Sequence, residues 1–268
     1  MKESAEGIIR AHLREVPLHR VIVRSAEALL LQEVDFARPM LDVGCGDGHF
    51  ASVVFPRGVD VGIDPEVRDA SVAARRGTYR LVAGASSYSL PFPDASFASV
   101  LSNCVLEHIA DLDRALEEIS RVLRPRGLFV CTVIGEHFPE FLTSPRAWSR
   151  WGLGRARKAY VDWFNRKAVH HHFDSPERWS ERFERTGLRV RRWRYYLSET
   201  ATRAMHRSHY WSLPHLFLRR LTGRWVPFPG LLDRPFRIKR LLRYVDEPEP
   251  LRGSCIAFEC ERSDSAVK

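Results

Sequence analysis

The chain has 268 residues, of which 44% are hydrophobic and 28% charged, a globular composition that fits one large domain or one domain with a sizeable insertion. Its net charge of +9 is unevenly spread. Residues 146–243 carry 24 Lys/Arg and 7 Asp/Glu, a net +17, whereas the remainder stands at −8. One acidic body therefore carries one basic segment, and such a segment suggests an acidic partner.

Several classes of protein are excluded by simple patterns. The opening residues lack an apolar secretory run, and no apolar stretch approaches the roughly 18 residues needed to span a bilayer. We therefore expect a cytoplasmic protein. Its five cysteines form no C-x-x-C pair, so neither a disulfide framework nor a structural zinc site is predicted.

Apolar spacing predicts the elements in chain order. Two helices, separated near Pro17, are expected within residues 8–34. Strands are expected at residues 40–43, 59–63, 79–82, 97–101, 128–134, 188–196 and 254–261. Helices are expected between them at residues 49–55, 68–76, 112–123 and 175–186.

This alternation predicts an α/β fold: a doubly wound, Rossmann-like, seven-stranded and mostly parallel sheet with helices on both faces. Residues 1–39 would form an N-terminal helical cap. Residues 40–198 and 251–262 would form the sheet domain. Residues 199–250 would be a basic and apolar helical cap, inserted before the last strand.

A glycine-rich turn follows the first strand at residues 44–48, and Asp42 precedes it. Glycines there let a ligand approach the backbone, because a Cβ would obstruct the turn or the contact. His49 stands where a dinucleotide-binding turn would carry its next glycine, which disfavours a pyrophosphate site. The second strand ends on Asp64, about 20 residues downstream, where a carboxylate can accept both hydroxyls of a ribose.

Further motifs follow in a fixed order: Leu90-Pro91-Phe92-Pro93-Asp94-Ala95-Ser96-Phe97, then Val105-Leu106-Glu107-His108-Ile109, then the segment 121–128. Together with the glycine turn and Gly62-Ile63-Asp64, they resemble the class I S-adenosylmethionine-dependent methyltransferases, in the type 11-like group that includes small-molecule, quinone and sugar methyltransferases. The resemblance covers residues 40–134. Beyond it, the chain matches only in its plan of strands and helices.

The resemblance implies S-adenosylmethionine as cofactor and S-adenosylhomocysteine as product. The glycine turn would line the amino-acid end of the cofactor, Asp42 would contact or orient that end, and Asp64 would take the ribose hydroxyls. Asn103 would line the methionine portion. The implied cofactor-binding residues are thus Asp42, Gly44, Cys45, Gly46, Gly48, Asp64, Ala85, Ser86 and Asn103.

Two departures from the family pattern stand out. After the third strand the family usually shows Gly-Asp-Ala, whereas the position that meets adenine is here Ala85 or Ser86, so a hydroxyl or a backbone amide would have to serve. The family's Phe-Asp pair is here Phe97-Ala98, which indicates lost support for the fold more than lost chemistry.

Methyl transfer from a sulfonium requires an acceptor held in line, in a pocket that excludes water. A hydroxyl acceptor would benefit from a general base, and histidine suits that role. The candidates are His137 after the fifth strand and the run at residues 170–172, with His171 at its centre. His108 either faces the substrate or packs at the start of a helix. The triple histidine lacks a carboxylate at convincing spacing, so no metal site is predicted.

The basic segment at residues 205–245 interleaves leucines and tryptophans with arginines. Such a mixture fits an element that lies in an anionic membrane interface, or a lid over a hydrophobic acceptor that carries an anionic group. It also fits a helical cap whose arginine face is solvated. Nucleic acid is the rival partner, but no RNA-binding fold signature accompanies the segment.

The function we expect is methyl transfer to a small-molecule acceptor, a hydroxyl of a glycosylated, lipid-linked or polyketide-like natural product. One alternative is C-methylation of a quinone-type lipid. Another is a non-catalytic, cofactor-binding regulator, which the replacements at Ala85, Ser86 and Ala98 motivate. The protein would act in the cytoplasm, with peripheral membrane contact as an option, and its oligomeric state is left open.

Overall fold

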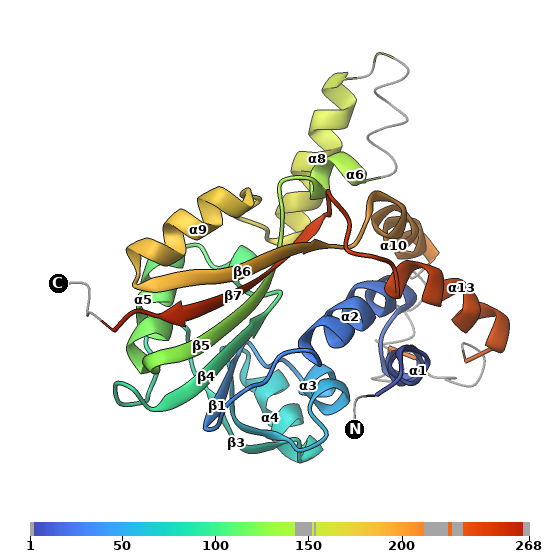
Figure 1. The fold of residues 1–268 in the computed structure, drawn as a ribbon. Coiled ribbons are helices and arrows are strands. Elements are labelled where there is room, and N and C mark those ends of the chain that lie inside the picture. The colour runs from blue at the N-terminus through green and yellow to red at the C-terminus, as the bar shows by residue number, and fades with distance from the viewer. Residues whose placement is uncertain (1–2, 143–151, 153, 212–224, 227–232, 265–268) are drawn as a thin grey trace. The chain divides into compact units, whose positions relative to one another are not determined.

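The computed structural model describes residues 3–142, 152, 154–211, 225–226 and 233–264. Within them, seven strands form one sheet in the order β3-β2-β1-β4-β5-β7-β6 (Figure 1). β1 pairs in parallel with β2 and β4, whereas β7 runs antiparallel to β5. The predicted α/β fold with a mostly parallel sheet is confirmed. The strands are β1 (Met40–Val43), β2 (Val59–Asp64), β3 (Tyr79–Gly84), β4 (Phe97–Asn103), β5 (Leu123–Ile134), β6 (Leu188–Tyr196) and β7 (Cys255–Arg262).

The chain divides into two compact units. The sheet unit comprises residues 34–136, 168–194 and 255–268. The helical unit comprises residues 1–33, 137–167 and 195–254. The domain boundaries expected from the sequence stay predictions.

Helices of the sheet unit connect and cover its strands. They are α3 (His49–Val54), α4 (Val67–Arg76), the short 3-10 helix η1 (Leu106–His108), α5 (Leu112–Val122) and α9 (Pro176–Arg185). Phe183 of α9 packs edge-on against Phe129 of β5 and Phe258 of β7, with ring centroids 6.0 and 5.2 Å away. All three rings are fully buried, so α9 joins the core through aromatic contacts.

The order of the strands determines where on the sheet a ligand can bind. The chain moves outward from β1 to β2 and β3, and then returns to place β4 on the other side of β1. In open α/β sheets such a reversal opens a crevice at the carboxyl ends of the strands. The glycine turn follows β1, and residues 104–109 follow β4, so both border this switch point.

The helical unit consists of α1 (Ala5–Glu15), α2 (Leu18–Leu31), α6 (Phe138–Phe141), α8 (Gly154–Ala168), α10 (Glu199–Trp211) and α13 (Pro235–Val245). Arg10 ties α1 to Asp233, two residues before α13: its guanidinium lies 2.5 Å from the Asp233 carboxylate. The buried Glu27 carboxylate accepts hydrogen bonds from Arg24 and Tyr196 at 3.1 Å each. These charged groups are therefore satisfied inside the unit.

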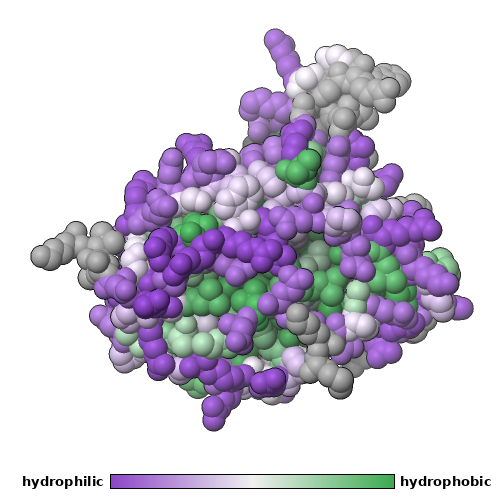
Figure 2. Space-filling view, in the orientation of Figure 1, coloured by the Kyte–Doolittle hydropathy of each residue, from purple (hydrophilic) through white to green (hydrophobic). Residues whose placement is uncertain are grey.

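The expected basic segment at residues 205–245 is described in part, because 212–224 and 227–232 lie outside the described residues. Figure 2 shows apolar surface over α2 and α13 of the helical unit, bordered by hydrophilic side chains. No helix in the described part of the chain is long and apolar enough to cross a membrane.

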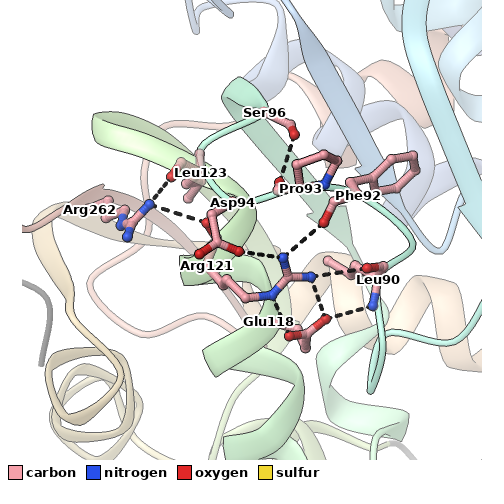
Figure 3. A network of polar contacts seen from close by, with 9 residues as sticks. All are labelled: Leu90, Phe92, Pro93, Asp94, Ser96, Glu118, Arg121, Leu123 and Arg262. Atoms are coloured by element: carbon pink, nitrogen blue, oxygen red, sulfur yellow. Dashed lines mark hydrogen bonds and ion pairs between the residues drawn. The ribbon is translucent and has the colours of Figure 1, made fainter. Parts of the chain in front are cut away.

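Arg121 of α5 explains why two of the sequence motifs occur together (Figure 3). Its five N–H groups all donate: to both oxygens of Glu118, to the Asp94 carboxylate and to the carbonyls of Leu90 and Phe92, at 2.7–3.0 Å. The Glu118 carboxylate also accepts from the Leu90 N–H at 2.7 Å. One guanidinium thus fastens the loop before β4 to α5.

Candidate active site

The three glycines of the turn all have positive φ, but for different reasons. A Cβ on Gly44 (φ +83°) would lie 2.4 Å from a Val105 methyl, and one on Gly48 (φ +76°) would lie 3.1 Å from Ala73. A Cβ on Gly46 (φ +53°) would meet no atom within 4 Å. Gly44 and Gly48 are therefore required by packing within the protein, whereas Gly46 presents its backbone to open space.

Asp64, at the end of β2, is joined to this turn directly. One carboxylate oxygen accepts from the Gly46 N–H at 2.8 Å and the other accepts from the Glu66 N–H at 2.9 Å. A carboxylate has about four lone-pair positions, so acceptor capacity remains for two hydroxyls. The structure thus brings Gly46, which was predicted to line the amino-acid end of the cofactor, into contact with Asp64, the predicted ribose residue.

Asp42 faces the protein interior. It is 4% exposed, and its carboxylate accepts from the Tyr79 hydroxyl at 2.7 Å. Burial and the Asp42 carboxylate raise the pKa of Tyr79, so this hydroxyl remains a donor. The Tyr79 ring in turn lies 2.7 Å from where a Cβ on Gly62 would stand. Asp42 therefore orients the strand ends beneath the turn through Tyr79, a residue that sequence reasoning did not single out.

Asn103 ends β4 and is buried at 6% exposure. Its side-chain oxygen accepts from the Thr132 hydroxyl at 2.8 Å, and that hydroxyl accepts from the Cys104 N–H at 3.0 Å. Cys104 holds a positive φ of 53°, a costly conformation for a non-glycine residue. This backbone turns the chain sharply at the switch point, just before η1.

The remaining cofactor residues differ in what they offer. The Ala85 N–H donates to the Asp64 carbonyl at 3.2 Å, and the Ser86 hydroxyl accepts from the Tyr88 N–H at 3.2 Å, so both positions shape the loop after β3. Cys45 is 7% exposed, and burial, followed by the Asp42 and Asp64 charges, raises the pKa of its thiol well above the usual range. Its thiol is therefore no nucleophile at neutral pH.

The histidines separate into two groups. In the sheet unit, the His108 ring lies 5.0 Å from the His170 ring, and His108 Nδ1 lies 3.1 Å from the Val169 carbonyl. The His171 N–H donates to the Glu107 carbonyl at 2.8 Å. The structure thus brings η1, directly after β4, together with the triple-histidine run.

His170 and His171 differ in exposure within that cluster. Burial, followed by the neighbouring His108 and His171, lowers the pKa of His170 to about 4, so it is neutral at pH 7. The His171 ring is exposed, and its recorded contact to η1 is made by the backbone. His108 is the exposed ring that a backbone carbonyl orients.

His137 belongs to the helical unit. Its ring lies 5.7 Å from both Phe141 and Tyr195, and Arg252 donates to it at 3.3 Å while also pairing with Glu140 at 2.8 Å. These contacts give His137 a packing role in its own unit.

The residues present fit an adenosyl cofactor. Gly46 offers open space over a bare backbone, and Asp64 on the adjacent strand offers free acceptor positions for ribose hydroxyls. In the part of the chain that the structure describes, no group of three metal-ligating side chains gathers. A sheet of this order, with a glycine turn at its switch point, defines a Rossmann-like methyltransferase fold.

Comparison with known proteins agrees. Residues 41–131 match the family described as Methyltransferase domain. An uncharacterized methyltransferase of Mycolicibacterium vanbaalenii is 42% identical over 97 residues, 34% of this chain and 37% of that protein. A demethylmenaquinone methyltransferase of Symbiobacterium thermophilum is 33% identical over 143 residues, 48% of this chain and 54% of that one. The matches therefore span a third to just over half of these relatives.

Solved structures extend the likeness of fold over most of the chain. An S-adenosylmethionine-dependent methyltransferase from Thermotoga maritima aligns with 92% of this chain and 91% of its own at a TM-score of 0.54, with 17% identity. Residues 41–131 thus match a methyltransferase family, and the chain has the fold of S-adenosylmethionine-dependent methyltransferases. The matched family and this fold imply S-adenosylmethionine as the cofactor.

Proposed function

We propose that this protein transfers the methyl group of S-adenosylmethionine to a hydroxyl of a small-molecule acceptor, of glycosylated, lipid-linked or polyketide-like chemistry, with His108 as the general base. The observation that carries the proposal is the pairing of His108 Nδ1 with the Val169 carbonyl, directly after β4. A carbonyl only accepts, so Nδ1 carries the proton and Nε2 keeps the lone pair.

The chain's own residues would divide the work as follows. Asp64 would hold the ribose hydroxyls and the Gly46 backbone would line the amino-acid end, while Asn103 and the Cys104 turn shape the path from β4 to η1. When bound, the cofactor supplies an electrophilic methyl group on a positively charged sulfur. His108 Nε2 would take the proton of the acceptor hydroxyl as its oxygen receives that methyl group. The neutral His170 beside it lets the new imidazolium form without an adjacent charge.

Cofactor binding is the first test. Calorimetric titration of the full chain with S-adenosylmethionine and S-adenosylhomocysteine should give micromolar binding, and a nicotinamide dinucleotide should not bind. Binding of the dinucleotide, or of none of the three, would overturn the cofactor assignment. Binding without turnover on any acceptor would instead favour the non-catalytic regulator.

The base is tested with methyl-labelled cofactor and a pool of hydroxylated glycosides, polyketide-like phenols and lipid-linked sugars. His108→Gln should lower the rate of methyl transfer by about 10²- to 10⁴-fold while leaving cofactor affinity unchanged. The acidic limb of the pH–rate profile, where protonation disables the base, should vanish, and added imidazole should restore part of the rate. A loss that follows His171→Gln instead would assign the base to the histidine run.

A second candidate is C-methylation of a quinone-type lipid. It is supported by the similarity of this chain to the demethylmenaquinone methyltransferase, which is 33% identical over 143 residues. A demethylated quinone added to the same labelled assay separates the two. Methyl incorporation that survives hot hydriodic acid, which cleaves methyl ethers but leaves carbon–carbon bonds intact, would favour the quinone.

A further inference from the structure

A cavity of about 410 Å³ lies within the helical unit, between α2, α10 and α13. Leu18 and Ile22 of α2 and Leu241 of α13 form its apolar floor, and the last two are 2% and 5% exposed. Three arginines contribute to its lining: Arg207, Arg237 and Arg240. A buried floor beneath exposed charged groups makes a concave site of amphiphilic character, within the roughly 300–1,000 Å³ of small-molecule pockets.

The described residues that line the cavity include cationic side chains. Among the described residues that line the cavity there is no Asp or Glu. Other arginines of this unit are engaged with carboxylates, as Arg203 is with Glu199 and Arg252 with Glu140. Arg207 and Arg240 are exposed, and no ion pair is recorded for either within the described part of the chain. Their guanidiniums are thus available to an anion, and a guanidinium fork matches a phosphate in geometry.

We propose that this cavity binds one molecule of a phosphate-headed amphiphile, with its apolar chain on the floor of α2 and α13 and its phosphate on Arg207 and Arg240. Charge complementarity selects the anionic head, and the buried aliphatic floor selects the chain. The site is concave, so it takes a single ligand from solution rather than a membrane face. Phe236, 69% exposed and stacked by Arg237 at 5.9 Å, would cover the entering chain.

Calorimetric titration of the full chain with dodecyl phosphate, below its micelle concentration, tests this. One molecule should bind per chain, and inorganic phosphate and dodecyl maltoside should each bind at least tenfold more weakly. Arg207→Gln and Arg240→Gln should each weaken dodecyl phosphate about tenfold, the factor that accompanies loss of one charge-assisted hydrogen bond. Arg243→Gln is the matched control, because Arg243 is exposed on α13, as Arg240 is, but lies outside the cavity lining.

Three results would overturn the proposal: no binding of dodecyl phosphate, equal weakening in Arg243→Gln, or binding confined to vesicles of anionic phospholipid. The last would assign the arginines to a membrane surface. Unchanged melting temperatures of the variants exclude unfolding as the cause. The outcome is independent of methyl transfer, since cofactor titration of the same samples reports on the sheet unit.

Discussion

The sheet unit and the helical unit are specified by their sequences in different ways. In the sheet unit, particular backbone positions decide the geometry: a Cβ on Gly44 or Gly48 would come within 2.4–3.1 Å of another side chain or backbone. In the helical unit, the core is made of aliphatic residues such as Ile8, Ile9 and Val21, which many similar residues could replace. Motifs therefore persist in the first unit and fade in the second, and the family match ends at residue 131.

The largest effect on stability is expected from substitutions in the glycine turn of the sheet unit. Gly44→Ala places a Cβ 2.4 Å from the branched Val105 side chain at a φ of +83°, and should lower the free energy of unfolding by about 2 to 5 kcal/mol. Gly46→Ala, with nothing within 4 Å, should cost only about 1 to 2 kcal/mol and act chiefly on cofactor binding. Denaturant unfolding and calorimetry separate the two. Equal stability losses would refute the division between packing and binding glycines.

The next effect concerns Arg121, which joins two motifs of the sheet unit. Arg121→Ala removes all five of its hydrogen bonds, including those to the Leu90 and Phe92 carbonyls, and should lower the free energy of unfolding by about 2 to 3 kcal/mol. The control is Arg124→Ala, an exposed arginine two residues beyond α5. A melting temperature unchanged in Arg121→Ala would mean that the loop before β4 is held by other contacts.

Much of this architecture could be predicted because its signals are local. Alternating apolar runs located all seven strands. The largest difference between a predicted and an observed strand boundary is at β5, which begins at Leu123 instead of residue 128. The extra residues are Leu123-Arg124-Pro125-Arg126-Gly127. Among them only Leu123 is a large apolar residue, and two arginines and a proline follow it, so no apolar run marks this part of the strand. A register shift between β4 and β5 accommodates them beside Phe97 and Ser99.

Long-range partners could not be predicted. Tyr79 is one residue of a short strand, and only the fold shows its hydroxyl on Asp42, 37 positions away. The histidine run gave no sign of its partner either, because the Val169 carbonyl that orients His108 lies 61 residues along the chain. His137 was a candidate base because it follows the fifth strand, and the structure assigns it to the helical unit. Spacing in sequence reports on single elements, whereas these contacts depend on which elements become neighbours.

A smaller effect, on cofactor affinity, is expected at Asp64, which contacts the glycine turn. Asp64→Ala removes acceptors for the Gly46 N–H and for ribose hydroxyls, and should weaken S-adenosylmethionine binding by about 1 to 3 kcal/mol. Calorimetry gives the affinity, and thermal unfolding shows whether the turn still folds. Wild-type affinity in this variant would remove Asp64 from the ribose site.

The smallest effect is a dependence on pH in the Arg121 network. The hydrogen bond from Arg121, opposed by burial and helped by the Leu90 N–H, holds the pKa of Glu118 below its ordinary value. A depressed carboxyl pKa contributes stability that is present above about pH 4.5, near the unfolded pKa, and is lost as the pH falls through the folded pKa. Glu118→Gln should therefore be less stable than the wild type at pH 7, by up to about 1 kcal/mol. That difference should shrink towards pH 3, and Glu117→Gln, on the exposed face of α5, should show no such convergence. A gap that stays constant with pH would mean that Glu118 acts by shape and not by charge.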